Sequence, residues 1–123
     1  MKNILVIAPH PDDEVLGCGG TIYKHYLNKD NVFVAIMTNA SKGAPDLFSD
    51  KEIDTVRKEA LKAHKILGVS ETIFFDFPAP RLNQYPTYKI ADKISLLIKK
   101  HKIDVIYIPH RGRSEERRVG KEC

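Results

Sequence analysis

The chain of 123 residues has no tryptophan and only two cysteines, Cys18 and Cys123. Two cysteines without CxxC spacing cannot form the disulfide framework of a small secreted domain. No apolar run approaches the ~20 residues that a membrane-spanning helix needs. The apolar residues before Pro9 are too few for a secretory signal, and no small-residue cleavage site follows them. We therefore expect a cytoplasmic protein with one domain and a modest core.

A large excess of charge of one sign is also missing. The chain has 20 Lys and Arg residues against 16 Asp and Glu residues, which gives a net charge of +4. The lysines are spread along the chain and form no basic patch, so nucleic acid is not an expected partner.

The last eleven residues, Arg113–Cys123, read RSEERRVGKEC and contain one apolar side chain besides the terminal cysteine. A common short-read sequencing adapter translates in frame to the same eleven letters. The other interpretation is a solvated, charged tail. We expect residues 1–112 to be the N-terminal part of a single domain, and residues 113–123 to be a non-native tail derived from the adapter.

Four short apolar runs alternate with three amphipathic segments, and this order predicts the fold. The expected strands are residues 2–8, 31–38, 72–77 and 103–108. The expected helices are residues 13–28, 49–67 and 87–100. Continuous apolar runs are typical of strands buried on both faces. The sequence thus predicts an α/β fold, a Rossmann-like parallel sheet with helices on both faces. The fold is truncated after the fourth strand, whose outer edge is expected to be bare.

The segment His10–Glu14 (HPDDE) places an imidazole and three carboxylates directly after the first strand. His10 and Asp13, three residues apart at a sharp turn, can face one ion, and nitrogen with carboxylate oxygen suits Zn²⁺. Asp12 lies between them, and a carboxylate close to a metal-bound water can accept its proton. The alternative is an acidic helix start that happens to follow a histidine.

Other candidate residues give weaker signals. The glycines around Cys18 do not form the GxGxxG of a dinucleotide site, and Cys18 is expected to be a small buried residue. His25, His64 and His101 stand in lysine-rich helical segments and are expected to be solvated. His110 follows the fourth strand, where a loop position and an active-site position stay equally open.

Arg57 belongs to the second expected helix. Its guanidinium could reach an anionic or carbonyl oxygen of a ligand. It could equally form an exposed pair with Asp54 or Glu52.

The residues Pro9–Glu14 resemble the [AP]HPDDE signature of the PIG-L/LmbE-like deacetylases, which are zinc-dependent enzymes that remove N-acetyl groups from amino sugars and their conjugates. Residues 38–43 resemble the family's loop after the second strand. Residues 57–60 and 67–69 resemble its R-x-E-A…LGV helix, and residues 103–110 resemble the strand that leads to its second metal motif. The resemblance covers nearly all of residues 1–112.

This resemblance implies that His10 and Asp13 are zinc ligands, that Asp12 is the general base and that Arg57 contacts substrate. The family completes its site with a His-x-Asp-His segment after the fourth strand. The second histidine of that segment is the third ligand, and the first is a general acid or oxyanion stabiliser. Here the sequence departs from the pattern, because the tail begins after Gly112. The third ligand is therefore absent, and the chain by itself is expected to be inactive.

We expect the complete protein to be a metal-dependent hydrolase that removes an N-acetyl group from an amino sugar or its conjugate. One alternative is a non-catalytic α/β sugar- or partner-binding module from a decayed gene. Another is a phosphatase or phosphoryl-transfer domain that uses Asp12 and Asp13 with Mg²⁺. The expected partner is a small molecule, while the identity of the sugar and homo-oligomerisation stay open.

Overall fold

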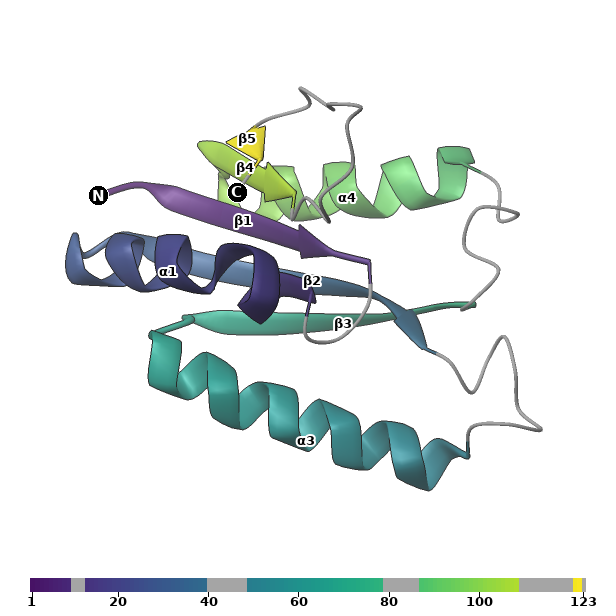
Figure 1. Cartoon of the computed structure of the whole chain (residues 1–123). Coiled ribbons are helices and arrows are strands. Elements are labelled where there is room, and N and C mark those ends of the chain that lie inside the picture. Colours follow the sequence, from purple (N-terminus) through teal and green to yellow (C-terminus); the bar gives the residue numbers. More distant parts are fainter. Residues whose placement is uncertain (10–12, 40–48, 79–86, 109–120, 123) are drawn as a thin grey trace.

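The computed structural model describes residues 1–9, 13–39, 49–78, 87–108 and 121–122. Its strands are β1 (Asn3–Ala8), β2 (Asn31–Asn39), β3 (Glu71–Pro78), β4 (Val105–Ile108) and β5 (Lys121–Glu122). Its helices are α1 (Asp13–Leu27), α3 (Asp50–Leu67) and α4 (Thr87–His101). The strands form one parallel sheet in the order β3-β2-β1-β4-β5 (Figure 1). The predicted α/β fold is confirmed.

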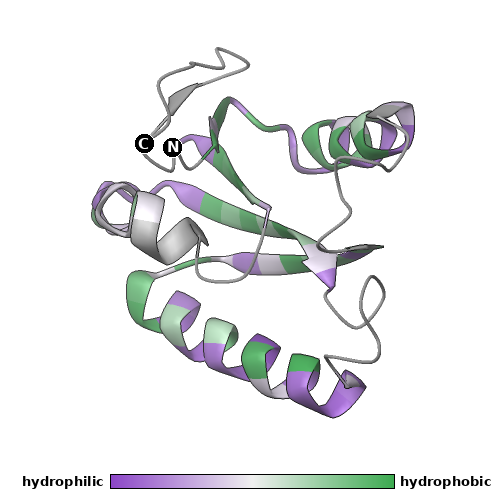
Figure 2. Ribbon diagram, turned by 45° about the vertical axis from the view of Figure 1, so that its right-hand side comes forward, coloured by the Kyte–Doolittle hydropathy of each residue, from purple (hydrophilic) through white to green (hydrophobic). Residues whose placement is uncertain are grey.

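Helices cover both faces of this sheet, with α1 and α3 on one face and α4 on the other (Figures 1 and 2). The connections from β1 to β2 and from β2 to β3 run in one direction along the sheet. The connection from β3 to β4 returns past β1 and therefore crosses the opposite face, as right-handed crossovers require. β1 is thus a central strand between β2 and β4.

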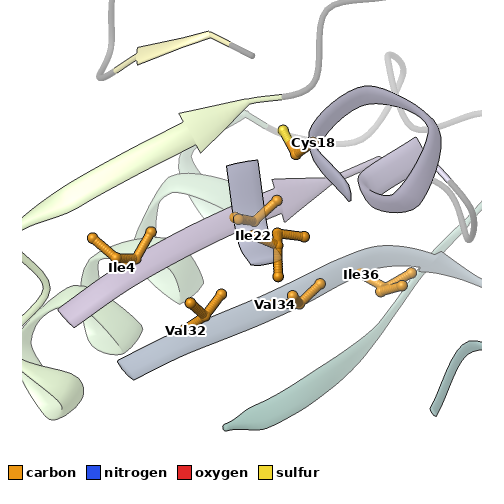
Figure 3. Packing of buried hydrophobic residues seen from close by; sticks show 7 residues of the cluster. Ile4, Cys18, Ile22, Val32, Val34 and Ile36 are labelled. Atoms are coloured by element: carbon orange, nitrogen blue, oxygen red, sulfur yellow. The ribbon is translucent and has the colours of Figure 1, made fainter. Parts of the chain in front are cut away.

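The core has two layers because the central strands are buried on both faces. The layer under α1 consists of alternate strand residues and two α1 side chains (Figure 3): Ile4, Val6, Cys18, Ile22, Val32, Val34 and Ile36. The layer under α4 holds Leu5, Ile7, Ala35, Met37, Phe77 and Leu97. The expectation that Cys18 is a small buried residue is confirmed, since it is 1% exposed.

Both ends of α3 are set by local chemistry. Ser49 accepts a hydrogen bond from the amide of Glu52, and the Glu52 side chain accepts one from the Ser49 amide in return. Gly68 ends the helix with φ of 85°, a left-handed conformation that glycine adopts without strain. These are the helix limits that the sequence predicts.

The three helix histidines are not solvated, so that expectation is wrong. His64 is 2% exposed, and its Nδ1 lies 2.7 Å from the hydroxyl of Thr72. The ring of His101 packs against Phe33, with 4.4 Å between the ring centroids. His25 is hydrogen-bonded at both ring nitrogens. The lysines occupy the outer helix surface, whereas these imidazoles contact the sheet or the strand ends.

The structure also differs from the expected bare edge. The tail, in which no element was expected, contributes Lys121 and Glu122, which pair with Tyr107 and Ile108 of β4. An outermost strand offers a row of backbone N–H and C=O groups, and an extended segment that reaches it can pair there. Within the described ranges, no helix is both long and apolar enough to cross a membrane.

Candidate active site

The metal-binding motif predicted from the sequence follows the central strand. In open parallel sheets, ligands bind beyond the carboxyl ends of the strands, where neighbouring connections leave in opposite directions. This switch point lies between β1 and β4. Asp13 is the first residue of α1, one short connection after β1. His10 and Asp12 lie outside the described residues, so the joint geometry of the three side chains stays a prediction.

The residue just before the motif is held by β2. The amide of Thr38 donates a hydrogen bond of 3.1 Å to the carbonyl oxygen of Pro9, and the Thr38 hydroxyl donates another of 2.7 Å to the same oxygen. Thr38 is buried, with 3% of its surface exposed. The residue that precedes the motif is therefore fixed to the neighbouring strand.

Arg57 of α3 reaches the carboxyl end of β3. Its Nη2 donates to the carbonyl oxygen of Phe75 at 2.9 Å and to Oδ1 of Asp76 at 2.8 Å. Its guanidinium carbon lies 4.8 Å from the ring centroid of Phe74. The same Asp76 oxygen accepts a hydrogen bond of 2.9 Å from the side chain of Asn39 in β2. Three elements thus place the guanidinium at the end of the sheet that carries the motif.

Arg57 does not pair with Asp54 or Glu52, the alternative partners expected from the sequence. The arginine side chain extends across to β3 instead of along its own helix, and only 20% of its surface is exposed. Within the described residues, hydrogen bonds of its guanidinium are formed by Nη2. Its remaining N–H groups can donate to an oxygen of a ligand. Whether they contact substrate stays a prediction.

Three residues of this region were not predicted individually from the sequence. Thr38 and Asn39 entered only as part of a loop that resembles the family, and Asp76 was not singled out. Asp76 is the one acid inside the run Thr72–Phe77, and an acid in an apolar strand close to its carboxyl end is a signal that could have found it.

In the part of the chain that the structure describes, no group of three or more His, Cys, Asp or Glu side chains is placed to hold a metal ion. The donor chemistry of the motif suits Zn²⁺, because one imidazole and one carboxylate flank the turn in the sequence. A cavity of about 660 Å³ lies elsewhere, between Tyr107 and the second half of α1. Its lining includes Thr21, Lys24 and His25.

The model of the PIG-L family, described as GlcNAc-PI de-N-acetylase, matches residues 5–118. The chain belongs to this family. The match begins in β1 and includes the motif, Thr38, Arg57 and Asp76.

Its curated relatives are deacetylases. The chain is 30% identical to diacetylchitobiose deacetylase of Thermococcus kodakarensis over 127 aligned residues, which cover 98% of this chain and 47% of the relative. It is 31% identical to the probable N-acetyl-alpha-D-glucosaminyl L-malate deacetylase 2 of Bacillus cereus, with coverage of 80% of this chain and 47% of the relative. The chain therefore spans about half the length of the curated relatives it matches.

A solved structure has the same fold. N,N'-diacetylchitobiose deacetylase from Pyrococcus horikoshii superimposes with a TM-score of 0.78 at 26% sequence identity. The alignment covers 96% of this chain and 44% of that structure.

Proposed function

We propose that the complete protein to which this chain belongs removes an N-acetyl group from an amino sugar or an amino-sugar conjugate. The observation that supports this most strongly is the family match over residues 5–118. Curated relatives named as deacetylases of diacetylchitobiose and of a glucosaminyl malate support the same substrate class.

We propose that His10 and Asp13 hold a zinc ion beyond the end of β1. A bound zinc ion would polarise the acetamide carbonyl and lower the pKa of the attacking water. A catalytic zinc site has three protein ligands and one open position, and these two residues are one short of that set. The 123-residue chain alone is therefore proposed to be inactive.

The other steps of the reaction are assigned to residues of this chain. Asp12 accepts a proton from the attacking water while the water oxygen bonds to the carbonyl carbon. The C–N bond then breaks, the amine nitrogen takes up a proton, and acetate and a free amino sugar leave. Arg57 donates a hydrogen bond to a substrate oxygen, with its guanidinium held in place by Phe75 and Asp76.

Asp12→Asn in the full-length gene product tests the proposed role of Asp12. The amide has the same shape but cannot take a proton, so kcat should fall by about 10²–10⁴-fold while metal content stays unchanged. Acetate release and elemental analysis measure the two quantities. Asp54→Asn, at an exposed position of α3, is the matched control and should change neither. Loss of metal together with activity would show that Asp12 is a ligand and that its role is wrongly assigned.

Two further measurements test the function as a whole. Sequencing the gene from source DNA across codon 112 should show the reading frame continuing into a His-x-Asp-His segment. Purified full-length product should then release acetate from N-acetylglucosamine conjugates. Sugar binding without acetate release would favour the binding module. Orthophosphate release stimulated by Mg²⁺ would favour the phosphatase.

A further inference from the structure

The connection between β1 and α1 is anchored at its first residue, Pro9, by two hydrogen bonds from a single residue of β2. Both the amide and the hydroxyl of Thr38 donate to the carbonyl oxygen of Pro9. Pro9 has no N–H of its own, so this carbonyl is its only backbone hydrogen-bonding group. The next residue in the chain is His10.

The position of Thr38 follows from the alternation of β2. Val34 and Ile36 belong to the core layer under α1, and the side chain two residues further on faces the same way. The pairing of β2 with β3 shifts in register between Ile36 and Thr38, whereas Thr38 keeps its bond to the chain that extends β1. A valine would continue the apolar series at this position, so the hydroxyl is the feature that needs an explanation.

The far end of the connection is anchored as well. α1 begins at Asp13 and is pinned to the sheet by Cys18 and Ile22, each 1% exposed (Figure 3). Only residues 10–12 separate Asp13 from Pro9. His10 is therefore adjacent to the Pro9 anchor, and Asp13 is the first residue of the helix that Cys18 and Ile22 pack against the sheet.

We propose that Thr38 is a positioning residue for the metal site: its hydroxyl fixes the Pro9 carbonyl and thereby the point from which His10 reaches the ion. The inference rests on the proposed function, because it presupposes that His10 and Asp13 bind metal. Groups that orient metal ligands typically change metal affinity by about 10–100-fold when they are removed. Because the hydroxyl is buried, water cannot replace its hydrogen bond when the side chain is shortened or made apolar.

The test uses two variants of the full-length gene product: Thr38→Val, which keeps the shape of the side chain and removes the hydroxyl, and Thr38→Ser, which keeps the hydroxyl. Cobalt(II) serves as the probe, because its visible absorption reports ligand geometry. Thr38→Val should weaken Co²⁺ binding by about tenfold and alter the absorption bands. Thr38→Ser should restore both.

Thr72→Val is the matched control. Thr72 is also a strand threonine with a hydroxyl hydrogen bond, in this case at 2.7 Å to Nδ1 of His64 near the opposite end of the sheet. Thr72→Val should lower the free energy of unfolding by about as much as Thr38→Val does, without changing the cobalt spectrum. Equal spectra for Thr38→Val and wild type, or equal changes for Thr72→Val and Thr38→Val, would overturn the proposal.

His10→Ala separates failure of this inference from failure of the proposed function. If His10→Ala leaves cobalt binding of the full-length product unchanged, or the full-length wild type binds no cobalt, the proposed metal centre fails. The role of Thr38 is then decided by amide hydrogen exchange of residues 10–14. Exchange that rises about tenfold in Thr38→Val and not in Thr72→Val supports the anchor, and unchanged exchange overturns it.

Discussion

At the scale of single residues, Gly68 is the point where the end of α3 packs against the end of α1. It terminates α3 with φ of 85°, and a Cβ at this position would overlap the ring of Tyr26 from α1. Any other residue here therefore meets both an unfavourable backbone conformation and a steric clash. The arrangement explains why the chain changes direction at this glycine before it enters β3.

Gly68→Ala should lower the free energy of unfolding by about 2–4 kcal/mol, from left-handed backbone strain together with overpacking against Tyr26. Gly20→Ala is the control, because a Cβ at Gly20 has no atom within 4 Å and alanine favours the helix. That control should be neutral or stabilise by up to about 1 kcal/mol. Urea denaturation measures both. Equal stability of the two variants would contradict this account of Gly68.

The roles of single residues could be predicted only where they depend on local sequence. The bounds of α3 agree with the predicted range 49–67 to within one residue, because caps such as Ser49 and Gly68 act within one turn of their helix. The hydrogen bond from Thr38 to Pro9 could not be predicted, since it spans 29 residues and requires the register of β1 against β2. Asp76 depends in the same way on how β3 lies beside β2 and α3.

At the scale of elements, Asp30 connects the beginning of β1 to the end of α1. Its Oδ1 accepts a hydrogen bond of 2.9 Å from the Lys2 amide, and its Oδ2 lies 2.8 Å from Nδ1 of His25. The other ring nitrogen of His25 lies 2.9 Å from the hydroxyl of Tyr107 in β4. This chain of polar contacts ties three elements together on the α1 side of the sheet. It also shows why His25 is not solvated.

The hydrogen bond from His25, with that from the Lys2 amide, lowers the pKa of Asp30 from 3.8 to about 2. A lowered folded-state pKa means that Asp30 contributes stability above its ordinary pKa. That contribution is lost as the pH falls through its folded-state value. Between pH 4 and pH 2, the wild-type chain should therefore lose stability more steeply than Asp30→Asn. Urea denaturation across this range is the measurement. Asp54→Asn should keep the wild-type slope, and parallel curves for wild type and Asp30→Asn would contradict the prediction.

The elements themselves could largely be predicted, because apolar periodicity is a local property. Among the four predicted strands, the main difference is that β4 begins at Val105 and not at residue 103. Lys102 adopts a positive φ of 52°, and the amide of Asp104 donates to the carbonyl of Asn3. Ile103 still packs in the core layer under α4, which is why it reads as part of the strand in the sequence.

At the scale of the whole molecule, the chain spans about half the length of its curated relatives and includes the predicted metal-binding motif. It places β1 between β2 and β4, and the switch point is therefore already formed. The curated relatives are about twice as long, and we propose that the rest of the full-length protein supplies the missing ligand.

Deleting residues 113–123 tests the proposal that this tail is not native. Its described contribution to the sheet is two residues paired with Tyr107 and Ile108, so under reducing conditions the deletion should cost no more than about 1 kcal/mol of unfolding free energy. The uncovered β4 edge should raise self-association, measured by sedimentation velocity under reducing conditions. Lys121→Pro, which removes one backbone donor but keeps the tail, should reproduce the small stability loss. A loss of several kcal/mol on deletion would show that the tail is an integral part of the fold.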